Sequence, residues 1–64
     1  MVLSKRIEVA IMEAERFIDR AMAWKKRLKE DESARFGSKE GGACKRSSLD
    51  LARALVELRK GYLE

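Results

Sequence analysis

The sequence predicts an all-α protein folded as an antiparallel helical hairpin, and three observations support that fold class. The chain has 64 residues and no proline, and its four glycines all follow residue 36. Apolar residues in the first half recur at alternating steps of four and three, which is the period of one face of an α-helix. The same pattern returns in the second half, after a glycine-containing segment. Two such helices joined by a short connection form an αα-hairpin.

The first helix is expected from about residue 5 to residue 35, a stretch without any helix-breaking residue. Ser4 is the expected N-cap, because a serine hydroxyl can accept a hydrogen bond from an otherwise unpaired amide. Two adjacent apolar rows make one wide stripe on this helix. One row contains Ile7, Ile11, Ala14, Ile18, Ala21 and Leu28, and the other contains Ala10, Ala14, Phe17, Ala21, Trp24 and Leu28.

The connection is expected at residues 36–38, Phe36-Gly37-Ser38. Glycine suits the left-handed residue that ends a helix, and the serine can cap the helix that follows. The second helix is therefore expected over about residues 39–62.

The start of the second helix has an alternative. Gly41 and Gly42 oppose an early start, because each costs up to about 1 kcal/mol relative to alanine inside a helix. A helix that begins as late as residue 48 would leave residues 37–46 as a flexible loop. The apolar row favours the early start, because it already begins at Cys44 and continues through Ser48, Leu51, Leu55, Leu58 and Tyr62.

The small size of the chain predicts self-association. Domains of about 60 residues usually need a disulfide, a metal or a partner chain to be stable. Cys44 is the only cysteine and there is no histidine, so an internal disulfide is excluded and a zinc site lacks its usual ligands. The wide stripe exceeds what one neighbouring helix covers, which favours a two-fold dimer closing into a four-helix bundle. The residues expected in the core or dimer interface are Ile7, Ile11, Ala14, Phe17, Ile18, Ala21, Trp24, Leu28, Leu51, Leu55, Leu58 and Tyr62.

No residue pattern predicts catalysis or a bound cofactor. Cys44 and the serines at 47 and 48 have no histidine to activate them. The carboxylates are interleaved with lysines and arginines and suggest no acid–base pair. The stretch 41–45 does not match a phosphate-binding loop. We therefore expect a non-enzymatic protein with no cofactor and no metal.

The charge balance is compatible with an acidic protein or a phosphate partner and requires neither. Lysine and arginine total 15 against 11 acidic residues, a formal net charge of +4. No apolar run approaches the roughly 18 residues of a membrane span, and the N-terminus lacks the apolar segment of a secretory signal. A cytoplasmic protein without membrane contact is the expectation.

A protein partner is expected at the turn end of the hairpin. Arg20, Lys45 and Arg46 are the less compensated basic residues there, and Phe36 adds an aromatic ring. Arginines and aromatic residues are enriched at the energetic centres of protein interfaces. Nucleic acid is the less favoured partner, because residues 30–32 are all acidic and cancel most of the positive charge around Trp24.

Part of the second half resembles a family of viral proteins. The segments GSKE (residues 37–40) and KRSSLDLARALVELRK (residues 45–60) are similar to the C-terminal half of short accessory proteins of temperate tailed bacteriophages. The resemblance implies a protein made inside an infected bacterium, where some such early proteins are helical-hairpin dimers that inhibit host regulators, including quorum-sensing transcription activators. It therefore favours an anti-activator. A small DNA-binding, transcription-modulating protein or a phage assembly adaptor is the alternative.

Overall fold

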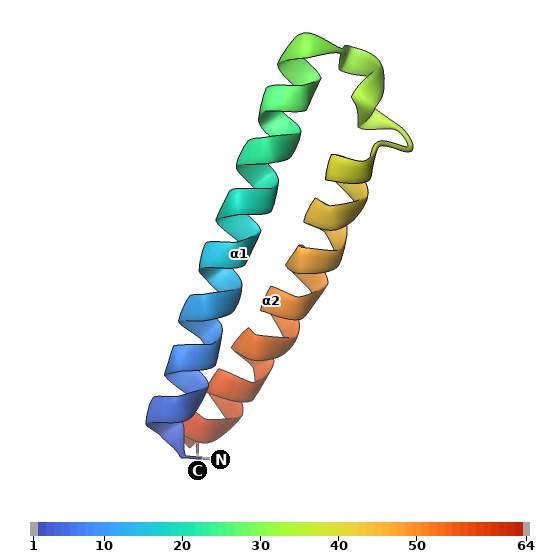
Figure 1. The fold of residues 1–64 in the computed structure, drawn as a ribbon. Coiled ribbons are helices and arrows are strands. Elements are labelled where there is room, and N and C mark those ends of the chain that lie inside the picture. Colours follow the sequence, from blue (N-terminus) through green and yellow to red (C-terminus); the bar gives the residue numbers. More distant parts are fainter. Residues whose placement is uncertain (1, 64) are drawn as a thin grey trace.

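Two long antiparallel helices make up most of the molecule (Figure 1). The computed structural model describes residues 2–63, and the side chains of residues 2–61. Its elements are α1 (Leu3–Glu30), a short 3-10 helix η1 (Glu32–Arg35) and α2 (Lys39–Leu63). The described residues form no strand, and the predicted all-α hairpin is confirmed. The molecule is elongated, with extents of 46, 15 and 13 Å.

Helix α1 begins slightly earlier than the sequence suggested. Its N-cap is Val2, whose side chain makes no capping hydrogen bond, and Ser4 therefore lies inside the helix. The expectation that Ser4 caps α1 is wrong. The amides of Lys5 and Arg6 instead donate to the Val2 carbonyl oxygen at 3.1 and 3.2 Å, as ordinary first-turn helical bonds do.

Helix α1 also ends earlier than expected, at Glu30 and not near residue 35. The cause is Asp31, whose backbone is extended, with φ −154° and ψ 104°. One oxygen of its carboxylate accepts hydrogen bonds from the Ser33 amide at 3.0 Å and from Ser33 Oγ at 2.6 Å. Such local side-chain bonds compete with the helical pattern, so the chain leaves α1 and starts η1.

Gly37 and Ser38 set the start of α2 at Lys39, the earlier of the two starts considered. Gly37 has a left-handed backbone with φ 71°, which only glycine adopts without strain. Ser38 Oγ accepts from the Gly41 amide at 3.0 Å, and the Gly42 amide donates to the Ser38 carbonyl oxygen at 3.1 Å. Ser38 is thus the N-cap of α2, and the connection between the long helices runs over residues 31–38.

Gly41 is tolerated inside α2 because the indole of Trp24 lies against it. A Cβ atom at position 41 would lie 2.9 Å from Ser38 Oγ, which would have to shift, and 3.0 Å from Trp24 Cε2, which is a tight contact. The indole Nε1 donates to the Ala34 carbonyl oxygen at 3.1 Å, and Ser38 Oγ donates to the same oxygen at 2.5 Å. Trp24 thereby connects α1, η1 and the first turn of α2, which accounts for a glycine at this position.

The open end of the hairpin has a comparable connection. Arg6 crosses from α1 and its Nη1 donates to the Glu57 carbonyl oxygen of α2 at 2.9 Å. Gly61 leaves room for this side chain, because a Cβ atom there would lie 2.8 Å from Arg6 Cδ. Both ends of the helix pair are therefore joined by a large side chain of α1 that packs over a glycine of α2.

Candidate interaction surfaces

The most deeply buried residues of the seam between α1 and α2 are small, and larger side chains line the seam half-buried. Ala10 of α1 and Cys44, Ser47 and Ala54 of α2 are buried, and among the described residues no large side chain is fully buried. Small side chains let the two helix backbones approach closely, but each contributes little apolar area. The core of a single hairpin is therefore thin.

Five exposed large apolar side chains share one broad side of the hairpin, whereas other exposed ones, such as Met12 and Leu49, point elsewhere. We call this surface the apolar face. Each of its members is an exposed residue, including Ile18 with 54% and Leu55 with 39% of its surface accessible. The apolar face consists of Ile7, Ile11, Ile18 and Met22 on α1 and Leu55 on α2.

The helical period explains why these side chains share one side. Ile11 follows the seam residue Ala10 by one position, and Leu55 likewise follows Ala54. One step along an α-helix turns the side chain by about 100°. Because the two helices run in opposite directions, these steps turn in opposite senses when viewed from one end. On both helices, a residue that comes one position after a seam residue therefore points to the same side of the hairpin.

The residues predicted for the core or dimer interface divide into two groups. In the single chain Ile7, Ile11, Ile18 and Leu55 are exposed, whereas the larger group is half-buried along the seam. The side chain of Tyr62 lies outside the described residues. The half-buried group is Ala14, Phe17, Ala21, Trp24, Leu28, Leu51 and Leu58.

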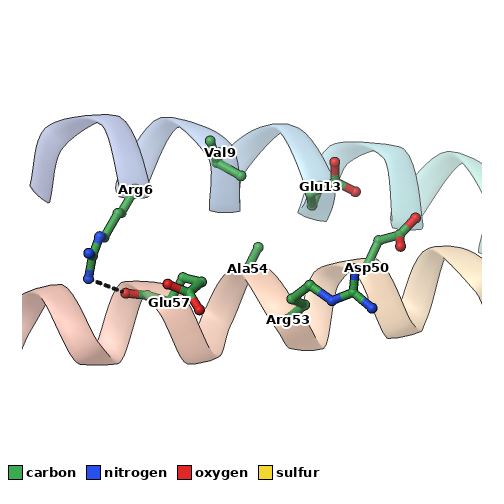
Figure 2. A pocket seen from close by; sticks show the side chains of 7 residues that line it. All are labelled: Arg6, Val9, Glu13, Asp50, Arg53, Ala54 and Glu57. Atoms are coloured by element: carbon green, nitrogen blue, oxygen red, sulfur yellow. Dashed lines mark hydrogen bonds between the residues drawn. The ribbon is translucent and has the colours of Figure 1, made fainter. Parts of the chain in front are cut away.

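The opposite broad side carries a groove of about 270 Å³ (Figure 2). Val9 and Ala54 supply its apolar lining, and charged side chains from both helices surround them. Val9 precedes the seam residue Ala10, so it points away from the apolar face. The charged residues of this groove are Arg6, Glu13, Asp50, Arg53 and Glu57.

Two further hollows of about 170 Å³ each continue this groove toward the turn. Asp50 also lines the first of them, and Arg20 and Ala43 line both. We call the hollow nearer the middle the arginine groove. Its lining residues are Arg16, Arg20, Ala43, Arg46, Ser47 and Asp50, and those of the last hollow are Arg20, Ala23, Lys39, Glu40 and Ala43.

The arginines of the arginine groove differ in their partners. Arg16 lies 3.8 Å from a carboxylate oxygen of Glu13, one turn away on α1. Arg20 and Arg46 form no hydrogen bond or ion pair with any residue of the described part of the chain. Ser47 is only 3% exposed, and its Oγ makes no hydrogen bond to the described residues. The groove therefore presents cationic groups and one buried hydroxyl with unused bonding capacity.

The structure brings together only two of the four residues predicted to bind a partner. Arg20 and Arg46 line the same groove. Lys45 is exposed, but its side chain points about 100° away from that of Arg46 around the axis of α2, and it lines none of these hollows. Phe36 projects from the turn with 79% of its surface exposed, and the Arg35 guanidinium carbon lies 5.9 Å from the centre of its ring.

Sequence reasoning missed Arg16 and Ser47 as groove residues. The signal for Arg16 was its position one turn before Arg20, which places both side chains on one side of α1. Ser47 had no comparable signal, because its burial depends on which residues of α2 face α1.

The pKa of the Asp31 carboxyl is lowered from its ordinary value. The chief cause is the hydrogen bond from Ser33 Oγ, followed by the bond from the Ser33 amide. The Arg27 guanidinium, 3.7 Å from the other carboxylate oxygen, also favours the charged form. The N-cap of η1 therefore remains ionised below the pH at which a free aspartate becomes protonated.

Comparisons with protein-family models, with curated proteins and with solved structures found no match. The described residues contain no group of three or more histidine, cysteine or acidic side chains arranged to hold a metal ion. No helix of the described part is both long and apolar enough to cross a membrane. Features with chemical character in the described part of the chain include the apolar face, the arginine groove, the exposed ring of Phe36 and a hollow of about 380 Å³ near the turn, which Trp24, Lys25, Lys29 and Arg35 help to line.

Proposed function

We propose that this protein is a non-enzymatic interaction module, a helical hairpin that self-associates through its apolar face and binds a second protein. One observation carries the proposal. The fully buried residues of the seam between the helices are small, whereas isoleucine, methionine and leucine side chains on one outer face stay exposed. Exposed apolar side chains gathered on one face often mark a protein interface.

A second copy of the chain is the occupant that the apolar face fits best. The hairpin extends about 46 by 15 Å along its two longer axes. A standard interface buries roughly 800 Å² on each partner, so the dimer would use most of one side of the hairpin. A two-fold axis places the same face of each chain in contact, so two hairpins close into a four-helix bundle. These isoleucine and leucine residues are about half exposed in the single chain. Burying the rest of each contributes about 1 kcal/mol, which supplements the thin core of one hairpin.

The dimer is tested by sedimentation equilibrium of the parent and two matched variants. The parent is expected at about 15 kDa, twice the 7.3 kDa chain mass. Ile11→Glu places a charge in the apolar face and is expected to abolish the dimer. Leu49→Glu makes the same kind of change at a residue that is 68% exposed and outside the apolar face, so it should leave the dimer intact. A cooperatively folded, monomeric parent would contradict the proposal.

The resemblance to phage accessory proteins supports a bacterial regulatory protein as the second partner. Binding of a rigid helical bundle to such a regulator would block the surface that the regulator uses for transcription activation. The measurement is titration of the protein against purified transcription activators of the quorum-sensing class, with activator-dependent DNA binding as the readout. Inhibition at a stoichiometric ratio is expected. Unchanged DNA binding by every activator tested would exclude this class of partner.

A further inference from the structure

We infer that the arginine groove binds carboxylate side chains on an acidic helical segment of a partner protein. This inference rests on the proposed function, because it names the chemistry of the partner's surface. It uses the side of the hairpin opposite the apolar face, so the groove remains open when two hairpins associate.

The cationic groups come from both helices. Arg16 and Arg20 lie one turn apart on α1, and Arg46 reaches the same hollow from α2. Arg20 and Arg46 have no ion pair or hydrogen bond within the part of the chain that the structure describes. A guanidinium group binds a carboxylate through two parallel N–H···O bonds, which makes arginine well suited to recognise acidic side chains.

Ser47 adds an observation that is independent of charge. Ser47 lines the arginine groove and is only 3% exposed. Its hydroxyl makes no hydrogen bond to any described residue. A buried hydroxyl without a partner is unfavourable, and native structures usually satisfy such groups. Ser47 is one of the residues that line the hollow between Arg20 and Arg46, so the unpaired hydroxyl lies beside this hollow.

The shape of the three connected hollows fits a helix. They follow the seam from Glu57 to Lys39, a length of about 27 Å at 1.5 Å per residue. Small apolar residues, Val9, Ala43 and Ala54, lie between the charged side chains. An amphipathic helix can place apolar residues on this strip and acidic residues beside the arginines.

The acidic residues in the groove favour a protein over a nucleic acid. Glu13 and Asp50 lie next to the arginines, and Glu40 lines the hollow beyond them. A nucleic acid backbone carries closely and evenly spaced negative charges, which would place phosphates against these carboxylates. A polypeptide can present carboxylates only where the arginines lie, so it avoids this repulsion.

The test uses the full-length protein and a pair of synthetic amphipathic peptides of about five helical turns. One peptide carries glutamates along one side and the other carries glutamines at the same positions. Fluorescence anisotropy at low salt is expected to show binding of the glutamate peptide and at least about tenfold weaker binding of the glutamine peptide. The side-chain Nε–H signals of Arg20 and Arg46 should shift during the same titration followed by NMR.

Two matched variants separate groove binding from net charge. Arg46→Gln is expected to weaken binding of the glutamate peptide about tenfold. Arg59→Gln removes the same charge from an exposed arginine of α2 that lines none of the hollows, and should change affinity less than about twofold. Equal losses in the two variants would overturn the inference, because net charge alone would then explain binding.

Two other outcomes also overturn it. Failure of the glutamate peptide to bind excludes carboxylate recognition. Tighter binding of duplex DNA than of the peptide, with a steep dependence on salt, would assign the groove to nucleic acid.

The mass of the parent is measured in the same samples. If the protein is a dimer but does not bind the glutamate peptide, only this inference is contradicted. If it is a monomer that binds the peptide, only the self-association in the proposed function is contradicted.

Discussion

The two broad sides of the hairpin differ in chemistry although their residues alternate along the same helices. Residues that follow the seam by one position, such as Ile11, Ile18 and Leu55, form the apolar face. Residues that precede it, such as Val9 and Arg16, point toward the charged grooves. A step of one residue thus separates a surface suited to a second copy from one suited to a charged partner. Because α1 and α2 run antiparallel, this division is consistent across both helices.

The largest expected effect compares a leucine of the apolar face with one outside it. Leu55→Ala should lower the free energy of unfolding by about 2 kcal/mol per chain, the lower end of the range for a buried leucine, if a second copy covers it. Leu49→Ala should cost less than about 0.5 kcal/mol, as expected for an exposed site. Chemical denaturation of both variants at equal concentration measures the difference. Equal, small losses would mean that the apolar face stays uncovered.

Trp24→Phe tests the turn, which lies at the end of both broad sides. Phenylalanine keeps an aromatic ring at this position, but the ring is smaller than the indole and lacks the N–H that donates to the Ala34 carbonyl oxygen. We expect the free energy of unfolding to fall by about 1–2 kcal/mol, from the lost hydrogen bond and the reduced packing, with no change in dimer mass. Thermal unfolding and sedimentation measure the two quantities. If the variant dissociates, the turn contributes to self-association and the two sides are not independent of it.

Ser47→Ala tests the floor of the arginine groove. Since the Ser47 hydroxyl is buried and unpaired among the described residues, its removal should leave stability unchanged or raise it by up to about 1 kcal/mol. Denaturant unfolding of the peptide-free protein provides the measurement. A loss of more than about 1 kcal/mol would indicate that the hydroxyl already has a partner, and would remove one argument for a ligand in this groove.

The smallest expected effect depends on pH and concerns Asp31 in the turn. Its pKa is lower in the folded protein than in the unfolded chain, so its contribution to stability is present above the unfolded pKa and is lost as pH falls through the folded one. A pH titration of the Ser33 amide shift should therefore have its midpoint below the ordinary value of 3.8. Asp31→Asn should abolish that transition. A midpoint at or above 3.8 would contradict the hydrogen bonding described for the carboxylate.

Periodicity and turn residues were sufficient to predict the hairpin. The four-and-three spacing identified both helices, and Gly37 and Ser38 act at the turn as glycine and serine commonly do. The early end of α1 was missed although Asp31 and Ser33 carry the side chains that form it. An aspartate two residues before a serine also occurs within helices, so only the competition between local bonds decides the outcome.

The rotation of α2 about its own axis was predicted from the sequence only in part. The apolar row contained the buried Cys44 and the half-buried Leu51 and Leu58. It also contained Ser48 and Leu55, whereas their neighbours Ser47 and Ala54 are the buried residues. Hydrophobicity favours large residues for a core, but two closely packed backbones favour small ones. The same uncertainty explains the candidate site. Arg46 and Lys45 were both predicted from their charge. The rotation of α2 about its axis decides that Arg46 lines the same hollow as Arg20 and that Lys45 does not.

The most direct test of the central claim, that the two sides have separate roles, is an isotope-filtered NOE experiment on mixed labelled and unlabelled protein. Intermolecular NOEs are expected to the methyl groups of Ile11, Ile18 and Leu55, which belong to the apolar face. None are expected to Val9 or Ala43, which line the grooves on the other side. Intermolecular NOEs at Val9 and Ala43, with none at the isoleucines, would contradict that claim.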